Sequence, residues 1–345
     1  KKINYTQLDK IFHKIILGNK FVGEFLFDLE NFIYKNKYQN LKNEKHIFIS
    51  GYARSGTTLL LQLLYETKKY STLRYADVPF ILAPNIWKLL FKKKNLKQSK
   101  RSHNDLILID NNSPEAFEEV FWKMILKNSY ISKYHIHKNY LENNEMQKFE
   151  YFINQVCLCN NKNLYLSKNN NNILRFKNIL DYFKNLFLLI TIRNPIDHAE
   201  SLLNQHHLHL KLQNNDKFTR EYMEFLGHHE FGKSHLKFKL FNHQKNNFSI
   251  DSINYWLYEW NNYYNYIYEN FQSTNNRIII LSYDRILNEK YKYLHLLEKK
   301  INIVFNQNKK IHNNTTQKNI TDSIDKKIYE ECKNIEKKLL EISLT

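Results

Sequence analysis

The chain has 345 residues, of which 42% are hydrophobic and 15% aromatic, so it can bury a sizeable core within one large domain. Its net charge is +18, but the lysines are spread along the chain. This argues against a nucleic-acid-binding protein and leaves composition bias or an anionic small ligand. Three cysteines exclude a disulfide framework, and no apolar run approaches the roughly 18 residues of a membrane span. We therefore expect a cytoplasmic protein with buried thiols. A removed N-terminal signal or anchor is the open alternative, since the first residue is not Met.

The beginning of the chain predicts helices followed by an α/β unit. Residues 46–50 form a short apolar run that predicts a strand, and residues 57–65 predict a helix directly after a glycine-bounded loop. This order of strand, tight loop and helix is typical of a parallel α/β unit. The first 45 residues show helical spacing, with the packing side predicted at Phe25, Leu29, Phe32 and Ile33.

Further strands are predicted at 164–166, 186–192 and 277–282. The second of these is continuously apolar, as expected for a central strand that is buried on both faces. A helix follows each of the first two strands, and a long aromatic helix precedes the third. We predict a single α/β domain over residues 1–345, with a mostly parallel central sheet, helices on both faces and a helical insertion at about 203–260.

Residues 50–58 read SGYARSGTT and have the G-x-x-x-x-G frame of a phosphate-binding loop. Its glycines let backbone N–H groups turn toward an anion at the N-terminus of the next helix. A P-loop nucleotide kinase or NTPase would place Lys after the second glycine. Here Thr57 follows Gly56, and the cation is Arg54, inside the loop. The P-loop NTPases are therefore the alternative enzyme class, and a basic nucleic-acid-binding protein is the non-enzyme alternative.

The stretch from Tyr52 to Leu59 resembles the 5′-phosphosulfate loop of sulfotransferases that use 3′-phosphoadenosine 5′-phosphosulfate (PAPS). Arg193 and Ser201 resemble a second motif of this family, in which an arginine at the end of a strand is followed eight residues later by a serine. Both side chains can converge on one phosphate, because Ser201 falls two turns into the following helix. The resemblance covers about 46–80 and 164–300, and it implies the P-loop-like sulfotransferase fold and sulfuryl transfer to a hydroxyl or amine. It assigns the 5′-phosphosulfate to Arg54, Ser55, Gly56, Thr57 and Thr58.

Three more positions are interpreted through this resemblance. Lys168 matches the lysine that neutralises charge near the transferring group, and Tyr283 matches a tyrosine that borders the adenine. Asn170 stands where cytosolic sulfotransferases carry their catalytic histidine, so the general base must come from elsewhere. The chain also departs from the family at Leu59, where many relatives stack a tryptophan on adenine.

Asp77 is our first candidate for the base, because the stretch around it resembles Y-x-D-M-P-F of some bacterial sulfotransferases, and carboxylates after the same strand act as the base in glycan and tyrosyl relatives. Its alternative role is to cap a helix that opens at Pro79. His103 and Glu115 are the next candidates as catalytic residues. Glu115 has a structural alternative in the first turn of a helix starting at Ser113, where a negative charge favours the helix dipole.

The histidines between positions 206 and 235 are irregularly spaced, and no carboxylate set accompanies them. We therefore predict no metal site and expect these histidines to line the acceptor cleft. The expected partner is a small-molecule or glycan acceptor, with neither nucleic acid nor a membrane span, and the oligomeric state is open.

Overall fold

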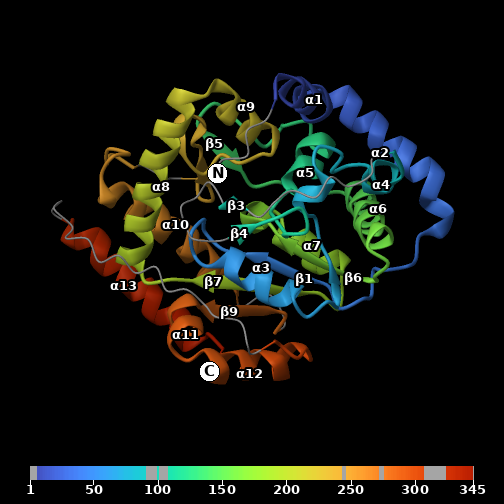
Figure 1. The fold of residues 1–345 in the computed structure, drawn as a ribbon. Helices are drawn as coiled ribbons and strands as arrows, with labels where there is room; N and C mark the ends of the chain where they lie inside the picture. The colour runs from blue at the N-terminus through green and yellow to red at the C-terminus, as the bar shows by residue number, and fades with distance from the viewer. Residues whose placement is uncertain are drawn as a thin grey trace.

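The computed structural model describes residues 6–90, 99–100, 108–242, 246–271, 276–306 and 324–344. A five-stranded sheet lies at the centre of the molecule (Figure 1), and every neighbouring pair of its strands is parallel. The predicted α/β fold is confirmed. In spatial order the strands are β2 (Tyr70–Ser71), β6 (Leu164–Lys168), β1 (Ile47–Ser50), β7 (Phe187–Ile192) and β9 (Ile278–Ser282).

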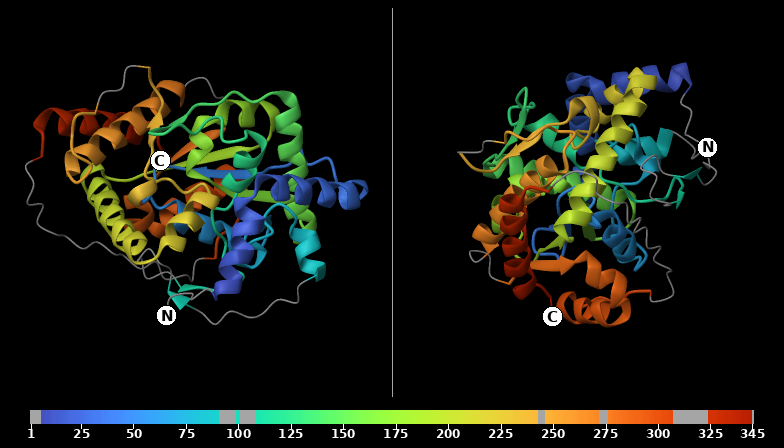
Figure 2. Two further views of the ribbon diagram at one scale, coloured as in Figure 1. Left: turned by 90° about the horizontal axis from the view of Figure 1, so that it is seen from above. Right: turned by 90° about the vertical axis from the view of Figure 1, so that its left-hand side faces the viewer.

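Each face of the sheet is covered by its own set of helices (Figures 1 and 2). Alternate strand residues point to opposite faces, so each set of helices packs against a different set of strand side chains. Phe48 belongs to an apolar cluster that includes side chains of the helices on one face, and Ile47 and Ile49 belong to a second cluster. The first cluster includes residues of α6 (Asn143–Cys159), α7 (Phe176–Tyr182), α10 (Ile253–Phe271) and α13 (Lys326–Glu341). The second includes residues of α3 (Thr57–Tyr65) and α12 (Lys290–Ile301).

The carboxyl ends of the parallel strands meet at one edge of the sheet, which is where ligands bind in open α/β folds. From this edge β1 leads into the phosphate loop and α3, and β6 ends at Lys168. Strand β7 leads through Arg193 into α8 (Pro195–Asn215), and β9 leads into α11 (Tyr283–Asn288). The predicted cofactor residues therefore emerge from the same edge.

The two N-terminal helices, α1 (Gln7–Gly18) and α2 (Lys20–Tyr34), form as predicted, but the buried side of α2 was predicted wrongly. Phe25 and Phe32 are 63% and 76% exposed, whereas Phe27 and Glu30 are buried. The Glu30 carboxylate accepts a hydrogen bond from Asn85 N at 2.8 Å, in the first turn of α4 (Pro84–Leu90). Helix α2 is turned toward this polar contact, and apolar spacing alone carries no information about it.

Two predicted helix starts are also wrong. Pro79 and Ser113 do not begin helices, and α4 and α5 (Glu119–Ile125) start later in the chain. The backbone around Ser113 instead lies along the segment that follows β2, where Glu115 N donates to Leu73 O at 3.1 Å. Glu115 therefore sits in a loop, and a helix dipole does not account for its position.

The segment predicted as a helical insertion contains α9 (Lys217–Phe225) and also a strand, β8 (Lys237–Lys239). Strand β8 pairs in parallel with β5 (His135–His137), far away in the sequence. A short antiparallel pair, β3 (Ser99–Lys100) and β4 (Leu108–Ile109), lies elsewhere. The three cysteines are buried and unpaired, as predicted. None of the helices among the described residues combines the length and apolar composition that a membrane span requires.

Candidate active site

The phosphate loop needs glycine at position 56. Gly56 has φ +96° and precedes α3, and no side chain caps this helix. A Cβ atom at Gly56 would lie 2.3 Å from Cδ2 of Tyr283, so the position has no room for a side chain. The N-terminal backbone donors of α3 and the positive end of its dipole therefore face the loop, as an anion-binding site requires.

The predicted cofactor residues meet around this loop. Arg54 Nε donates to Ser201 Oγ at 3.4 Å, and Arg193 Nη1 donates to the Arg54 carbonyl oxygen at 3.4 Å. The Arg193 guanidinium also lies 5.2 Å from the centre of the Tyr283 ring. Arg193 Nε is buried and has no hydrogen-bond partner among the described residues. Two arginines and a hydroxyl thus converge where one buried N–H lacks an acceptor, which fits an anionic ligand.

Tyrosine side chains of α10 form hydrogen bonds next to the phosphate loop. Sequence reasoning did not assign this role to the aromatic helix. Tyr264 OH donates to Thr191 O at 2.8 Å, and the Thr191 hydroxyl lies 2.6 Å from Ser55 Oγ. Tyr263 OH donates to the Asn170 carbonyl oxygen at 3.2 Å. The loop is therefore fixed to the ends of β6 and β7 through buried hydroxyl groups.

His198 supports the loop from α8. Trp260 Nε1 donates to His198 Nδ1 at 3.1 Å, so the proton of this ring is on Nε2, which donates to Ala53 O at 2.7 Å. Burial, together with the nearby arginine charges, lowers the pKa of His198 to about 3. The ring is neutral, and it acts as a fixed hydrogen-bond bridge to the loop backbone.

Lys168, at the end of β6, lies beside a buried carboxylate. Its Nζ is 3.9 Å from Oε1 of Glu115, and both side chains are buried. Glu115 Oε2 accepts a hydrogen bond from Tyr75 OH at 3.0 Å. The structure therefore brings together two of the predicted catalytic residues, Lys168 and Glu115.

Asp77 is held differently. Its carboxylate accepts hydrogen bonds from Arg74 N at 2.8 Å and from Arg74 Nη2 at 3.0 Å, within the short helix η2 (Tyr75–Asp77). Both oxygens are engaged by one arginine, as in a structural ion pair. His103, the remaining candidate, lies outside the described residues.

Asn170 has a fixed orientation, and a carboxylate that sequence reasoning missed is the cause. Asn170 Nδ2 donates to Glu230 Oε1 at 3.1 Å, and a carboxylate can only accept. Burial would raise the pKa of Glu230, but His228 and Lys168 lower it to about 2, so Glu230 is ionised. The buried Asn170 Oδ1 has no partner among the described residues. Glu230 belongs to no sequence motif, so only tertiary contacts identify it.

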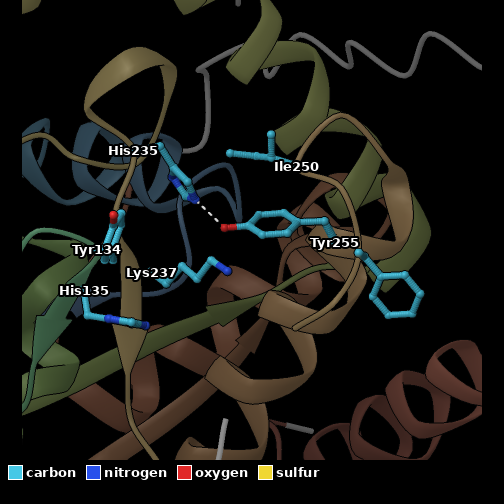
Figure 3. Close-up of a pocket in the computed structure, with 7 residues that line it drawn as sticks. Tyr134, His135, His235, Lys237, Ile250 and Tyr255 are labelled. Atoms are coloured by element: carbon cyan, nitrogen blue, oxygen red, sulfur yellow. Dashed lines mark hydrogen bonds between the residues drawn. The ribbon is translucent and has the colours of Figure 1, made fainter. Parts of the chain in front are cut away.

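The histidines of the 206–235 segment lie in different environments, and His207 is exposed. His206 and His209 are buried, whereas His235 lines a pocket of about 440 Å³ with residues of β5, β8 and α10 (Figure 3). The prediction that these histidines line a cleft is thus wrong for His206 and His209. Within the described ranges, no group of three or more His, Cys, Asp or Glu side chains is placed to hold a metal ion.

Comparisons with known proteins concern the family and the fold. A family model described as "Sulfotransferase family" matches residues 46–235, more than half of the chain. A sulfotransferase structure from Mycobacterium tuberculosis is similar, with 10% identity, a TM-score of 0.54, and coverage of 88% of this chain and 79% of that one. One from Mycobacterium avium has 9% identity, a TM-score of 0.48, and coverage of 97% and 78%. The curated protein sequences gave no significant match. At this identity the first structure supports the fold.

Proposed function

The chain belongs to the sulfotransferase family, whose implied donor is PAPS, and we propose that it transfers the sulfuryl group to a hydroxyl or amine of a small-molecule or glycan acceptor. The donor supplies an activated sulfuryl group. The residues of this chain bind the donor, neutralise charge and remove the acceptor proton. The contact between the phosphate loop and the Arg193–Ser201 motif is the observation that carries this proposal.

That contact joins residues more than 130 positions apart: Arg54 reaches Ser201, and Arg193 reaches the backbone of Arg54. We assign the 5′-phosphosulfate to residues 54–58 and the 3′-phosphate to Arg193 and Ser201, with Tyr283 beside the adenine. The two anion subsites adjoin, as a donor with both groups on one ribose requires. The unpartnered Arg193 Nε supports this assignment.

We propose Glu115 as the general base, ahead of Asp77. Asn170 cannot accept a proton at neutral pH, and its unpartnered Oδ1 is suited to accept a hydrogen bond from the acceptor hydroxyl. Both oxygens of each carboxylate accept hydrogen bonds, but Glu115 lies beside Lys168, whereas Asp77 forms an ion pair with Arg74. The acceptor oxygen bonds to sulfur as the bond from sulfur to the phosphate oxygen breaks, and Glu115 takes the proton. Lys168 neutralises the leaving oxygen.

Ligand-dependent melting tests the donor assignment. Adenosine 3′,5′-bisphosphate should stabilise the protein far more than ADP, because only the former offers a 3′-phosphate to Arg193 and Ser201. A ligand present at 100 times its Kd adds about 2.7 kcal/mol to the free energy of unfolding. Incubation with sulfur-labelled PAPS and a panel of alcohols, glycosides and amines then tests the transfer itself.

Equal stabilisation by the bisphosphate and ADP would remove the 3′-phosphate assignment. Stabilisation by ATP with Mg²⁺, accompanied by phosphate release, would instead support the NTPase alternative. Ser201→Ala is a second test, since it removes one hydroxyl from the 3′-subsite and should reduce the response to the bisphosphate more than the response to ADP.

A further inference from the structure

A pocket lies between the paired strands β5 and β8 and the first turns of α10 (Figure 3). Its volume is about 440 Å³, enough for a small ring-shaped group. Aromatic rings supply much of its wall, and apart from the two tyrosine hydroxyls its polar groups belong to two histidines and one lysine. The lining residues are Tyr134, His135, His235, Lys237, Phe248, Ile250 and Tyr255.

The pocket is linked to the proposed reaction centre through a rigid hydrogen-bond chain. His235 Nδ1 donates to the Glu230 carbonyl oxygen at 2.7 Å, so its Nε2 accepts the hydroxyl proton of Tyr255, also at 2.7 Å. Burial lowers the pKa of His235 to about 4, which keeps this ring neutral and the pattern intact. The side chain of the same Glu230 binds Asn170.

Helix α10 runs from the pocket to the proposed reaction centre, so the distance between them can be estimated along this helix. Tyr255 lines the pocket, and Tyr263 binds the Asn170 backbone beside Lys168. Eight residues separate the two tyrosines, which corresponds to about 12 Å along a helix. This length is within the span of one acceptor molecule that carries a ring at one end and the reacting group at the other.

The ribbon beside the pocket carries positive charge on its outer face. Ile136 and Phe238 are buried, so the alternating residues His135, Lys237 and Lys239 point the other way. Lys237 Nζ lies 5.1 Å from the centre of the Tyr255 ring. None of the carboxylates that the structure describes forms an ion pair with either lysine.

Glu259 is the acidic neighbour of Lys237, and it does not cancel the positive charge. Burial raises the pKa of Glu259 to about 7, and Asn246 Nδ2 donates to its Oε1 at 3.0 Å. A large fraction of this carboxyl is therefore protonated at neutral pH. The charge of Lys237 remains available to a ligand that enters the pocket.

We propose that this pocket binds a negatively charged ring of the acceptor, and that the enzyme prefers anionic, ring-bearing acceptors to neutral ones. The aromatic walls pack against the ring, and Lys237 pairs with its carboxylate or sulfate. A uronic-acid sugar and an aromatic carboxylic acid share this chemistry. The inference rests on the proposed function, since it names the class of acceptor for the same reaction.

Paired acceptors that differ in one charge test the proposal. With PAPS and the full chain, 4-nitrophenyl glucuronide should have a kcat/KM about tenfold higher than 4-nitrophenyl glucoside, mainly through KM. Lys237→Met should remove this difference, and Lys237→Arg should restore most of it. Lys239→Met, on the same strand and face but outside the pocket lining, is the matched control and should keep the preference. Hydroxybenzoate and hydroxybenzyl alcohol repeat the comparison for aromatic acids.

Calorimetry with the adenosine bisphosphate complex measures acceptor binding without turnover. Loss of glucuronide and hydroxybenzoate affinity in Lys237→Met, with bisphosphate affinity unchanged, would support the pocket. Equal use of charged and neutral acceptors, an unchanged preference in Lys237→Met, or no binding of either anionic ring would overturn it. Failure of the proposed function is distinguishable, because the protein would then bind no bisphosphate and transfer no label to any acceptor.

Discussion

The donor end and the acceptor end of the proposed site lie at the same edge of the sheet, but they are built differently. At the donor end, one continuous loop contacts one Arg–Ser motif. The buried hydroxyl of Tyr264 in α10 donates to Thr191, whose own hydroxyl lies beside Ser55 of the loop. At the acceptor end a largely buried polar cluster is formed by residues of three segments: Glu115, Lys168 with Asn170, and Glu230. A contiguous motif can be recognised from its spacing, whereas such a cluster exists only after folding.

The largest effect should come from Glu115→Gln. If Glu115 removes the acceptor proton, kcat should fall about 10²–10⁴-fold while the affinity for adenosine 3′,5′-bisphosphate stays the same. Asp77→Asn is the matched control. It weakens the ion pair with Arg74, so it should lower the melting temperature while kcat stays close to that of the wild type. Steady-state kinetics and calorimetry on both variants would separate the roles. The opposite pattern would return the base to Asp77.

Glu259 predicts a pH-dependent stability on the acceptor side. Burial raises its pKa from the ordinary 4.5 to about 7, so the folded protein retains a proton that the unfolded chain loses. Stability should therefore fall as the pH rises from about 4.5 to 7, by at most about 3 kcal/mol. Glu259→Gln should match the wild type at pH 4.5 and melt at a higher temperature at pH 8. A melting difference that does not change with pH would contradict this origin.

Arg193→Ala tests the donor end alone. Losing a charge-assisted hydrogen-bond fork costs about 1.5–3 kcal/mol, so the affinity for adenosine 3′,5′-bisphosphate should drop about 10- to 150-fold. The affinity for adenosine 5′-phosphate, which lacks the 3′-group, should change little. Titration calorimetry with both nucleotides measures the difference. Equal losses would show that Arg193 is structural, through its contact with the Arg54 backbone.

The smallest effect is expected for Glu230→Gln. A carboxylate can only accept, so it fixes the Asn170 amide, whereas glutamine can donate as well and leaves both orientations possible. We expect kcat/KM for the acceptor to fall by a few fold up to about tenfold, because the glutamine can still accept the hydrogen bond but carries no charge. The KM for PAPS should not change. A parallel loss of bisphosphate affinity would show that the two ends are not separable.

Local patterns in the sequence predicted much of the scaffold. The strands β1, β7 and β9 were found because a continuously apolar run of this length has few other ways to be buried. The loop from Arg54 to Thr58 was predicted from its glycine frame and from the resemblance to sulfotransferases, and the pair Arg193 and Ser201 from the same resemblance; the structure places the two segments in contact. Those predictions depended on neighbours in the chain, which the sequence shows directly.

Other predictions failed where a distant partner decided the outcome. The buried side of α2 follows from the contact of Glu30 with α4, and the loop conformation of Glu115 follows from pairing with Leu73. His206 and His209 look the same in sequence as the pocket residue His235, yet they are buried away from it. Composition at these positions is compatible with several environments, and the packing of other segments selects one.

The sequence by itself determined the parallel α/β scaffold and the glycine-bounded loop between β1 and α3, because these depend on backbone periodicity and on glycine at a position with positive φ. Only the tertiary structure decided which carboxylate stands beside Lys168, which way the Asn170 amide points, and that a basic aromatic pocket lies about two helical turns away. Hydrogen bonds and charges act over a few ångströms. Their partners are therefore known only once the chain has brought distant segments together.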